Sequence, residues 1–316
     1  MLQGLNLVSN MKTLFILIKR NMKLFFKDKG VFFTSLITPL ILLVLYVTFL
    51  GNVYKNTFND IIPEVFHKID GYNEIINGLV GSQLFSSLLA VSCITVAFSS
   101  NMIMVSDKVN GTIDDILITP VKKSTLAVSY YIATFLNTLL VCMCAFIACL
   151  IYIAFTGWYL TFVDVMFIIL DILLLTMFGT ALSSLINFFL KSQGQISAVG
   201  AIVSSCYGFI CGAYMPLSSF GTTLQKILSF LPGTYGTSLL RNHTMNGPIG
   251  ALQELSSNGI KVPNELITGI KDSVDCNVYF FDNLVYEWQM FLYIGIFTFL
   301  VIGIYVLLTK FKKRYK

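Results

Sequence analysis

Long apolar segments alternate with short polar ones along this chain, and six of the apolar segments are long enough to cross a membrane as helices. The first runs from Val31 to Leu50 without a charged residue. At about 1.5 Å per residue it spans the roughly 30 Å hydrocarbon core of a bilayer. The pattern therefore predicts an all-α integral membrane protein with six transmembrane helices, at Val31–Leu50, Gly81–Val105, Leu126–Phe155, Phe162–Phe188, Ile196–Met215 and Met290–Leu308.

The segment before the first span predicts a helix that lies along the membrane surface. Between Leu14 and Phe26 the apolar residues fall on one helical face and the basic residues on the other, with Ile16 as the exception. Such a helix lies in the interface plane. We expect Gly30 to break it, so the chain divides into residues 1–30, an amphipathic connecting helix, and residues 31–316, the membrane domain.

A polar island, residues 106–125, separates the second and third spans. Within it, Thr112 and Asp115 have the spacing of a near capping box, in which Thr112 accepts hydrogen bonds from the first backbone N–H groups of a short helix. Pro120 is expected to stop this helix. Its apolar stripe consists of Ile113, Ile116 and Leu117. The residues alone allow two interpretations, a solvated connector or a docking site for a soluble partner.

Two longer segments, residues 51–80 and 216–289, are predicted to be loops on the other side of the membrane from the polar island. The second contains a stretch from Leu224 to Leu231 with apolar residues at helical spacing, and this stretch ends at Pro232. Helical spacing of this kind predicts one amphipathic face. We therefore expect a short helix that dips back towards the bilayer, not a free loop.

The composition excludes a soluble domain. Hydrophobic residues make up 56% and charged residues 12% of the sequence, against about 25% charged residues in soluble proteins, and the mean hydropathy is +0.78. The net charge of +5 comes from basic clusters near the two ends of the chain, which suit anionic lipid better than nucleic acid. With the N-terminus inside, fifteen of the 21 Lys and Arg residues fall on the cytoplasmic side. The positive-inside rule then predicts that both termini are cytoplasmic.

The second and fifth predicted spans carry small and hydroxyl side chains that could line a moving seam or a translocation path. The fifth has a small residue at every fourth position, and these are Gly200, Ser204, Gly208 and Gly212. Small side chains also let helices pack closely in lipid, so static packing within one subunit is the alternative. The hydroxyl groups of the second span favour a wet or protein-facing surface, with the candidates Ser86, Ser92, Thr95 and Ser99.

Two carboxylates lie inside a predicted span, and Asp171 is the deeper one. We expect the other, Asp164, at the outer boundary, where it can reach lipid headgroups. A charge near the centre of the bilayer costs roughly 2.5–3.5 kcal/mol on insertion scales, so Asp171 marks a polar partner or a water-filled cavity. It could relay protons or take a hydrogen-bonded structural role, and the scarcity of other charges in the spans favours the structural role.

The sequence has no familiar motif for catalysis, metal binding or nucleotide binding. It lacks a Gly-x-x-x-x-Gly-Lys-Ser/Thr phosphate loop, so this chain cannot bind ATP by that route. His67 and His243 are far apart, each in a polar segment, so a histidine metal centre is not expected and no catalytic residue is assigned. Two alternatives to an ATP-driven transporter stay open. They are a membrane-embedded lipid-modifying enzyme, which needs a catalytic cluster, and an ion-coupled secondary transporter, which needs several midplane charges.

Three features together carry a family resemblance. They are the basic amphipathic helix before the first span, the segment Asp107-x-x-x-Gly111-Thr112-x-x-x-x-Leu117-x-Thr119-Pro120, and the segment Pro216…Leu231-Pro232…Tyr235…Leu239-Leu240-Arg241. With six spans, this order resembles the permease subunits of ABC-2 type (type V) ATP-binding-cassette exporters. The resemblance covers nearly the whole chain.

The resemblance implies that the polar island is a coupling helix seated in a groove of a separate nucleotide-binding subunit, which binds ATP and Mg²⁺. A charge or a proline at Ile116 or Leu117 is then expected to abolish docking. The candidate coupling residues are Asp107, Gly111, Thr112, Asp115, Ile116, Leu117 and Pro120. It also implies a second permease copy, identical or related, a path lined mainly by spans two and five, and outer re-entrant helices before the last span.

On this basis we expect a permease subunit in the cell membrane, with no cofactor and no enzymatic activity of its own. The substrate class stays open among drugs, peptides, lipids and polysaccharide-like molecules. Membrane lipid is a further partner, and no nucleic acid is expected.

Overall fold

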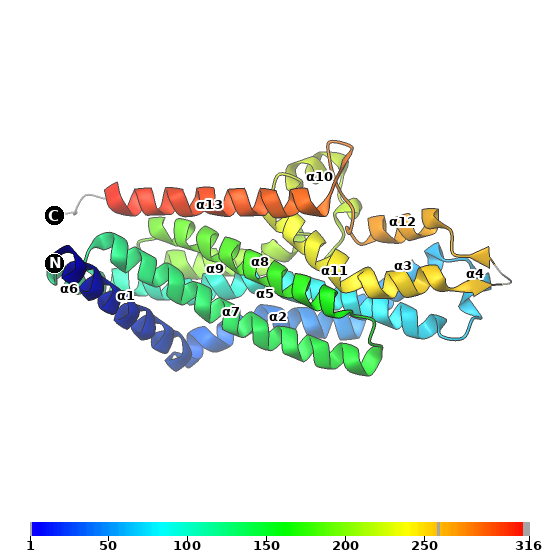
Figure 1. Cartoon of the computed structure of the whole chain (residues 1–316), viewed down its shortest axis with the longest axis horizontal. Helices are drawn as coiled ribbons and strands as arrows, with labels where there is room; N and C mark the ends of the chain where they lie inside the picture. Colours follow the sequence, from blue (N-terminus) through cyan, green and yellow to red (C-terminus); the bar gives the residue numbers. More distant parts are fainter. Residues whose placement is uncertain (1, 258–259, 312–316) are drawn as a thin grey trace.

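The computed structural model describes residues 2–257 and 260–311 and shows an elongated bundle of helices (Figure 1). In chain order the elements are α1 (Leu2–Lys27), α2 (Lys29–Leu45), the π-helical turn η1 (Tyr46–Leu50), α3 (Gly51–Ile61), α4 (Glu64–His67), α5 (Tyr72–Val109), α6 (Thr112–Ile118), α7 (Lys123–Thr156), α8 (Phe162–Phe189), α9 (Gln193–Ile210), the 3₁₀ turn η2 (Leu217–Ser219), α10 (Thr222–Leu228), α11 (Pro232–Glu254), β1 (Ser256–Ser257), β2 (Ile260–Lys261), α12 (Asn264–Ser273), β3 (Val278–Phe280), β4 (Asn283–Val285) and α13 (Glu287–Phe311).

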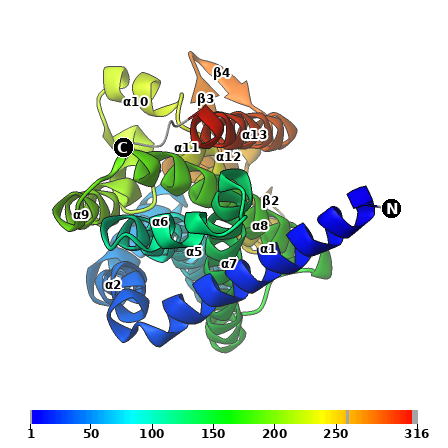
Figure 2. The ribbon, with the colours of Figure 1, turned by 90° about the vertical axis from the view of Figure 1, so that its left-hand side faces the viewer.

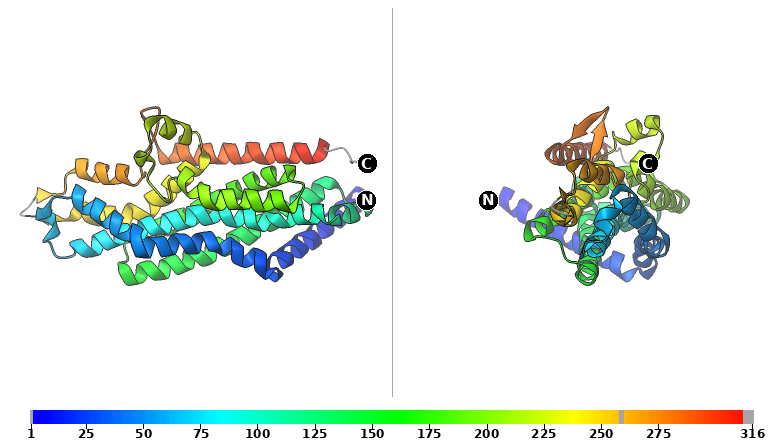
Figure 3. Two further views of the ribbon diagram at one scale, coloured as in Figure 1. Left: turned by 180° about the vertical axis from the view of Figure 1, so that it is seen from behind. Right: turned by 90° about the vertical axis from the view of Figure 1, so that its right-hand side faces the viewer.

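The two ends of the bundle differ in what they carry (Figures 1 and 3). One end, here called the α6 end, holds α1, α6 and the last described turn of α13. The opposite end, the α12 end, holds α4, α12 and the short hairpin of β1 and β2. Five helical segments of the described chain are long and apolar enough to cross a membrane, and they are Lys29–Ile61, Tyr72–Val109, Lys123–Phe155, Phe162–Phe189 and Glu287–Lys310.

Helix α5 is the central element of the fold. It is 38 residues long and packs against α2, α7, α8, α9 and α11. Figure 2, which looks along the bundle from the α6 end, shows it among these helices. Because protein surrounds it, 89% of its most apolar membrane-length stretch is buried, against 22% for α13. Polar side chains on α5 therefore face protein and not lipid.

The helix before the first span ends earlier than the sequence predicted. The carboxylate of Asp28 accepts a hydrogen bond from the backbone N–H of Val31 at 3.1 Å and caps α2, so the expected break at Gly30 is wrong. Helix α1 has the predicted two-sided character, since Phe25 is buried while Lys19 and Lys23 are exposed.

The predicted loop 51–80 is largely helical, which corrects the sequence analysis. Helices α2 and α3 join through η1 into one helical segment, Lys29–Ile61. Tyr46 and Tyr54 stack across the junction with their ring centroids 5.9 Å apart, and the Tyr46 hydroxyl donates to the carbonyl oxygen of Val80 in α5 at 2.5 Å. Packing against α5 thus extends the helix beyond the apolar run.

Helix α9 corresponds to the fifth predicted span, Ile196–Met215. It is 18 residues long and does not belong to the five segments that are long and apolar enough to cross a membrane, since it begins with Gln193 and contains Gln195. The helix ends at Ile210, and the chain turns at Gly212, where φ is 76°. A sixth span therefore stays a prediction.

The predicted loop 216–289 is a folded segment with three helices and two hairpins. The expected short helix is α10, which ends at Leu228, three residues earlier than the apolar stretch. Pro232 does not end a structured region; it is the first residue of α11, a position where proline needs no hydrogen-bond donor. Helix α11 packs between α5, α8 and α13. The residue pattern alone did not predict it, although the family resemblance implied outer helices in this segment. Strands β1 and β2 pair antiparallel, as do β3 and β4.

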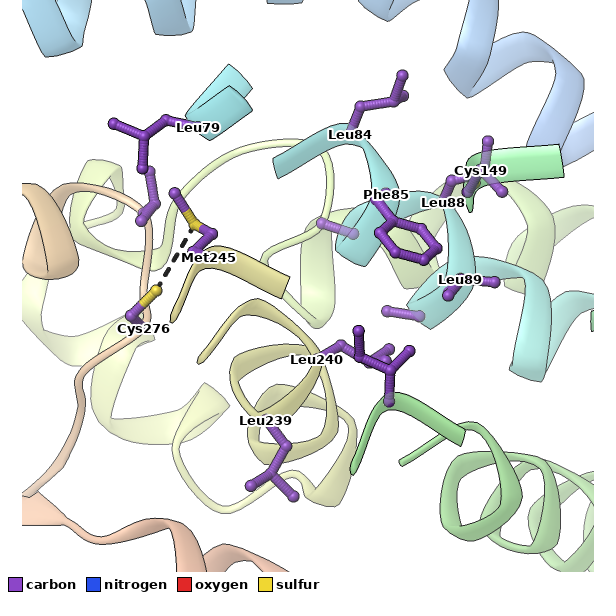
Figure 4. Close-up of a cluster of buried hydrophobic side chains, with 14 of the residues drawn as sticks. Leu79, Leu84, Phe85, Leu88, Leu89, Cys149, Leu239, Leu240, Met245 and Cys276 are labelled. Atoms are coloured by element: carbon purple, nitrogen blue, oxygen red, sulfur yellow. Dashed lines mark hydrogen bonds between the residues drawn. The ribbon is translucent and has the colours of Figure 1, made fainter. Parts of the chain in front are cut away.

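The main hydrophobic core lies where α5 meets α11 (Figure 4). Leu84, Phe85 and Leu89 of α5 are almost fully buried, as are Leu239 and Leu240 of α11. The Cys276 thiol donates to the Met245 sulfur at 3.8 Å and attaches the segment before β3 to the same core. Within the membrane such packing is stabilised by van der Waals contact and not by the exclusion of water.

Candidate functional site

Helix α6 lies where the chain leaves α5 and turns back towards α7. The N-cap is Gly111, whose φ of 77° is the left-handed conformation that glycine adopts without steric cost. The N-cap is therefore Gly111, which has no side chain, and not Thr112. The predicted capping box of Thr112 and Asp115 is wrong. The helix ends at Ile118, and Thr119 is extended, as expected for the residue before Pro120.

The apolar stripe of α6 points into this chain. Ile113, Ile116 and Leu117 pack against a hydrophobic cluster that includes Leu126 and Tyr130 of α7. They are half-buried, whereas the opposite face is exposed and consists of Asp114, Asp115, Ile118, Thr119 and Pro120. Ile116 and Leu117 contact their own subunit and are only half-buried, so their direct contact with a partner stays a prediction.

Ile118 is the apolar residue of α6 that lies fully at the surface. Its side chain is 79% exposed, and it stands beside Asp114 and Asp115 on the outward face. The exposed face of α6 is therefore the one opposite to the predicted stripe.

Asp107, at the end of α5, is held by two other helices. Arg20 of α1 contacts it in a bidentate manner, with Nη1 to Oδ2 at 2.6 Å and Nη2 to Oδ1 at 3.0 Å. Tyr130 of α7 donates its hydroxyl to Oδ2 at 2.6 Å. The hydrogen bond and charge of Asp107 raise the pKa of Arg20 against the effect of partial burial. Asp107 therefore braces the turn before α6 from inside the subunit.

The candidate path residues of α5 are buried within the single chain. Ser86, Ser92 and Thr95 are at most 1% exposed and Ser99 is 7% exposed. The first three donate to carbonyl oxygens of their own helix at 2.6–3.0 Å, so their hydrogen bonds are satisfied without water. In this conformation the four side chains are buried among helices and do not line an open channel.

The small residues of α9 permit close approach to neighbouring parts of the same chain. A Cβ on Gly200 would lie 2.7 Å from the Met102 side chain of α5, and one on Gly208 would lie 2.3 Å from the ring of Tyr214. Gly212 supplies the positive φ after the helix, and Ser204 is half-buried. This geometry favours the packing interpretation of the stripe.

Asp171 has a polar partner that sequence analysis did not find. His243 of α11 is buried, not in a polar loop, and its Nδ1 lies 2.6 Å from Oδ2 of Asp171. The imidazole also stacks on Phe167 at 4.8 Å, and its Nε2 lies 3.7 Å from Glu287 of α13. Burial lowers the pKa of His243, but the hydrogen bond and charge of Asp171 raise it more, so the net shift is upward.

Asp164 does not reach lipid headgroups. It is 3% exposed, accepts a hydrogen bond from the Asn246 side chain at 2.9 Å and forms a capping box with Thr161 at the start of α8. The two carboxylates of α8 thus both contact α11.

Arg241 of α11 is fully buried, although sequence analysis placed it in an outer loop. Its Nη1 lies 3.1 Å from Oδ2 of Asp275, and its Nη2 donates to the carbonyl oxygen of Gly212 at 2.5 Å. Asp275 also accepts a hydrogen bond from the backbone N–H of Leu217 at 2.7 Å. Burial raises the pKa of Asp275, although Arg241 opposes this shift. The pair fastens the 212–217 turn and the end of α12 to the core.

Most of these residues lie within the match to one protein family. The sequence model of the ABC-2 type transporter family matches residues 12–244. This chain belongs to the ABC-2 type transporter family. The match begins in α1 and ends in α11, so it includes Arg20, Asp107, α6, Asp171 and His243. No curated protein matches the chain.

Membership in the ABC-2 family determines the general character of the chain. It is the permease subunit of a transporter, a multi-pass membrane protein, and not an enzyme by itself. The described residues contain no group of three or more His, Cys, Asp and Glu side chains placed to hold a metal ion. Arg20, Arg241 and His243 were missed as site residues because each acts through a partner more than 30 positions away in the sequence.

Proposed function

We propose that this ABC-2 permease exports a substrate across the cell membrane with ATP that a separate nucleotide-binding subunit hydrolyses. The observation that carries the proposal is the two-faced helix α6, whose apolar stripe contacts the permease and whose other face is exposed. The partner would dock on that exposed face. ATP and Mg²⁺ would bind to the partner, and the substrate would be a drug, peptide, lipid or polysaccharide-like molecule.

The connections of α6 explain how docking could drive transport. Only Asn110 and Gly111 separate α6 from α5, and four residues separate it from α7, so a displacement of α6 must move both long helices. The contacts of Asp107 with Arg20 and Tyr130 add α1 to the same unit. A partner that changes shape on binding ATP therefore shifts the equilibrium of the permease in proportion to its differential affinity for the two states.

The basic residues support a cytoplasmic α6 end with both termini on that side. Lys108, Lys122, Lys123 and Lys191 belong to this end. A second permease copy, identical or related, would complete the translocation path. The segment from η2 to β4 would then lie on the outer side, with α10 and α11 as the re-entrant pair.

The docking proposal is tested by exchanging Ile118 for Glu in a tagged permease that is co-expressed with a phosphate-loop ATPase encoded beside it. Loss of a central apolar contact costs roughly 2 kcal/mol or more in protein interfaces, so co-purification of the ATPase should fall at least about tenfold. Ile118→Leu is the matched control and should keep normal binding. Membrane insertion and yield of both variants should equal those of the wild type.

A second variant separates docking from folding. Leu117→Ala removes an inward-facing side chain and should lower the stability of the permease while the folded fraction still binds the ATPase. Normal co-purification and ATP-driven transport by the Ile118→Glu permease would disprove α6 as the docking element.

A further inference from the structure

A cluster of aromatic side chains lies at the surface where α10 meets the hairpin of β3 and β4. Phe230 follows α10, and Phe280 and Phe281 lie at the tip of the hairpin. The Phe230 ring contacts the other two edge to face, with centroids 5.1 and 5.8 Å apart, and these two are 5.0 Å from each other. The three side chains are 36% to 51% exposed, and Ile227 of α10 is 57% exposed. We call these four residues the aromatic patch.

The turn of the hairpin holds Phe281 at the surface in an unfavourable backbone conformation. Phe280 pairs with Asn283, so the loop consists of Phe281 and Asp282, whose φ values are 46° and 69°. Both values are left-handed, as in a type I′ turn, which usually has Asn, Asp or Gly at its first position. A phenylalanine there is strained, yet 47% of its side chain stays exposed. Strain of this kind points to a role for the ring outside the subunit.

The aromatic patch lies beside the first turns of α13, the last candidate span. The Tyr293 hydroxyl donates to the carbonyl oxygen of Phe230 at 2.6 Å. Tyr293 follows Glu287, the first residue of the span, by about 9 Å along the helix at 1.5 Å per residue. Figures 1 and 2 show α10 and the hairpin at this end of α13, standing out from the bundle. The patch is therefore at the level where α13 enters the membrane.

The surroundings of the aromatic patch favour lipid as its partner. Apolar side chains continue from it along α13, since Ile296 and Leu300 are 66% and 55% exposed. Two charged residues border it: the Lys226 ammonium is 5.6 Å from the centroid of the Phe281 ring, and Asp282 is exposed at the turn. These charges oppose entry into the hydrocarbon centre. Aromatic rings beside charged side chains suit the membrane interface, where the rings lie among headgroups and the charges reach water.

We propose that the aromatic patch inserts among the lipid headgroups of the leaflet on the α12 side and anchors α10 and the hairpin to the membrane surface. The partner is phospholipid, contacted through its glycerol region and the first acyl carbons and not through one particular headgroup. The anchor attaches the α10 segment to lipid, while Tyr293 attaches it to α13. The hairpin lies outside residues 12–244, which match the family, and the anchor depends neither on the ATPase partner nor on the substrate.

The test uses one tryptophan in the patch and measures what quenches its fluorescence. The two native tryptophans are replaced by Trp158→Phe and Trp288→Phe, and Phe281→Trp is added. The full-length permease is placed in phosphatidylcholine nanodiscs, with or without bromine near the headgroup end of the acyl chains. Interfacial side chains lie about 5–10 Å deep at the headgroup–acyl boundary, close to the bromine, so brominated lipid should remove at least about half of the emission. Aqueous iodide should quench it weakly.

Two exposed positions in the same tryptophan-free background serve as matched controls. Val65→Trp places the indole on α4 at the α12 end, where Val65 is 60% exposed, and iodide rather than brominated lipid should quench it. Phe299→Trp places the indole within the span of α13, where Phe299 is 70% exposed. Brominated lipid should quench this indole, and iodide should not.

A second reporter leaves the strained turn intact. Ile227→Trp, without Phe281→Trp, adds the indole to α10 and should show the same pattern of quenching, and it decides the case if Phe281→Trp does not fold. Elution at the wild-type volume in size-exclusion chromatography identifies folded reporters. Quenching by iodide and not by brominated lipid would place the patch in water and overturn the proposal. Protection from both quenchers would assign the patch to a protein partner, such as a second copy of this chain, and overturn it equally.

Discussion

Two arginine–aspartate pairs hold opposite parts of this permease, and they differ in their access to water. In the pair of Arg20 and Asp107 at the α6 end, the Arg20 side chain is 31% exposed. In the pair of Arg241 and Asp275 under the 216–289 segment, the Arg241 side chain is 0% exposed. The first pair joins three helices through side chains alone, whereas the second also binds the backbone at Gly212 and Leu217. The cation of the first pair is therefore within reach of water, whereas that of the second is not.

The largest effect is expected from Arg241→Met. The substitution leaves the Asp275 carboxylate buried without its cation, and removal of one member of a buried ion pair costs about 3–5 kcal/mol. The variant should accumulate poorly, and its apparent melting temperature in detergent should fall sharply. Adding Asp275→Asn should restore part of the loss, because the charge is removed while the side chain can still accept from Leu217. A melting curve like that of the wild type would contradict the fastening role.

A smaller effect is expected from Arg20→Gln. Tyr130 still donates to Asp107, and the Arg20 side chain is partly exposed, so the cost should be about 1–2 kcal/mol. Salt sharpens the comparison, because ions screen exposed charges more than buried ones. The melting difference between wild type and Arg20→Gln should shrink in high salt, while the difference for Arg241→Met should not. Equal salt dependence of the two differences would refute the distinction between the pairs.

The smallest effect concerns a third link, between His243 and Asp171. Because the pKa of His243 is raised above its ordinary value of 6.5, its protonated form stabilises the fold fully below that value, and this contribution is lost as the pH rises through the raised pKa. The charged groups that raise its pKa are Asp171, Glu287 and Asp164. The melting temperature of the wild type should therefore fall more between pH 6 and pH 9 than that of His243→Gln. Identical pH profiles would exclude the linkage.

The long membrane helices were predictable because the insertion of a helix into the membrane depends on the apolar length and composition of its own segment. The apolar runs within α5, α7, α8 and α13 exceed the thickness of a bilayer, and no tertiary contact is needed to recognise them. Helix α11 shows the limit of this reasoning. Its residues Arg241, His243 and Asn246 are polar, and it is buried because Asp275, Asp171 and Asp164 meet them from other elements. A single sequence does not reveal such pairings.

For α6 the sequence predicted the element but not its orientation. The spacing of Ile113, Ile116 and Leu117 indicates one apolar face, but amphipathic spacing does not say whether that face covers the same chain or a partner. The hydrophobic cluster around Tyr130 and Tyr305 decides it, and that cluster forms only when α7 and α13 come together. Sites that depend on tertiary assembly are the ones that sequence reasoning placed wrongly.

Helix α5 also has a geometric consequence for the whole subunit. It contains 38 residues without a proline, so at 1.5 Å per residue it is a lever arm of roughly 57 Å that reaches from the α6 turn almost to the α12 end. A tilt of about 10° would carry one tip sideways by roughly 10 Å relative to the other, with no bending of the rod. A displacement beside Gly111 can therefore be transmitted along a single rigid rod towards the α12 end.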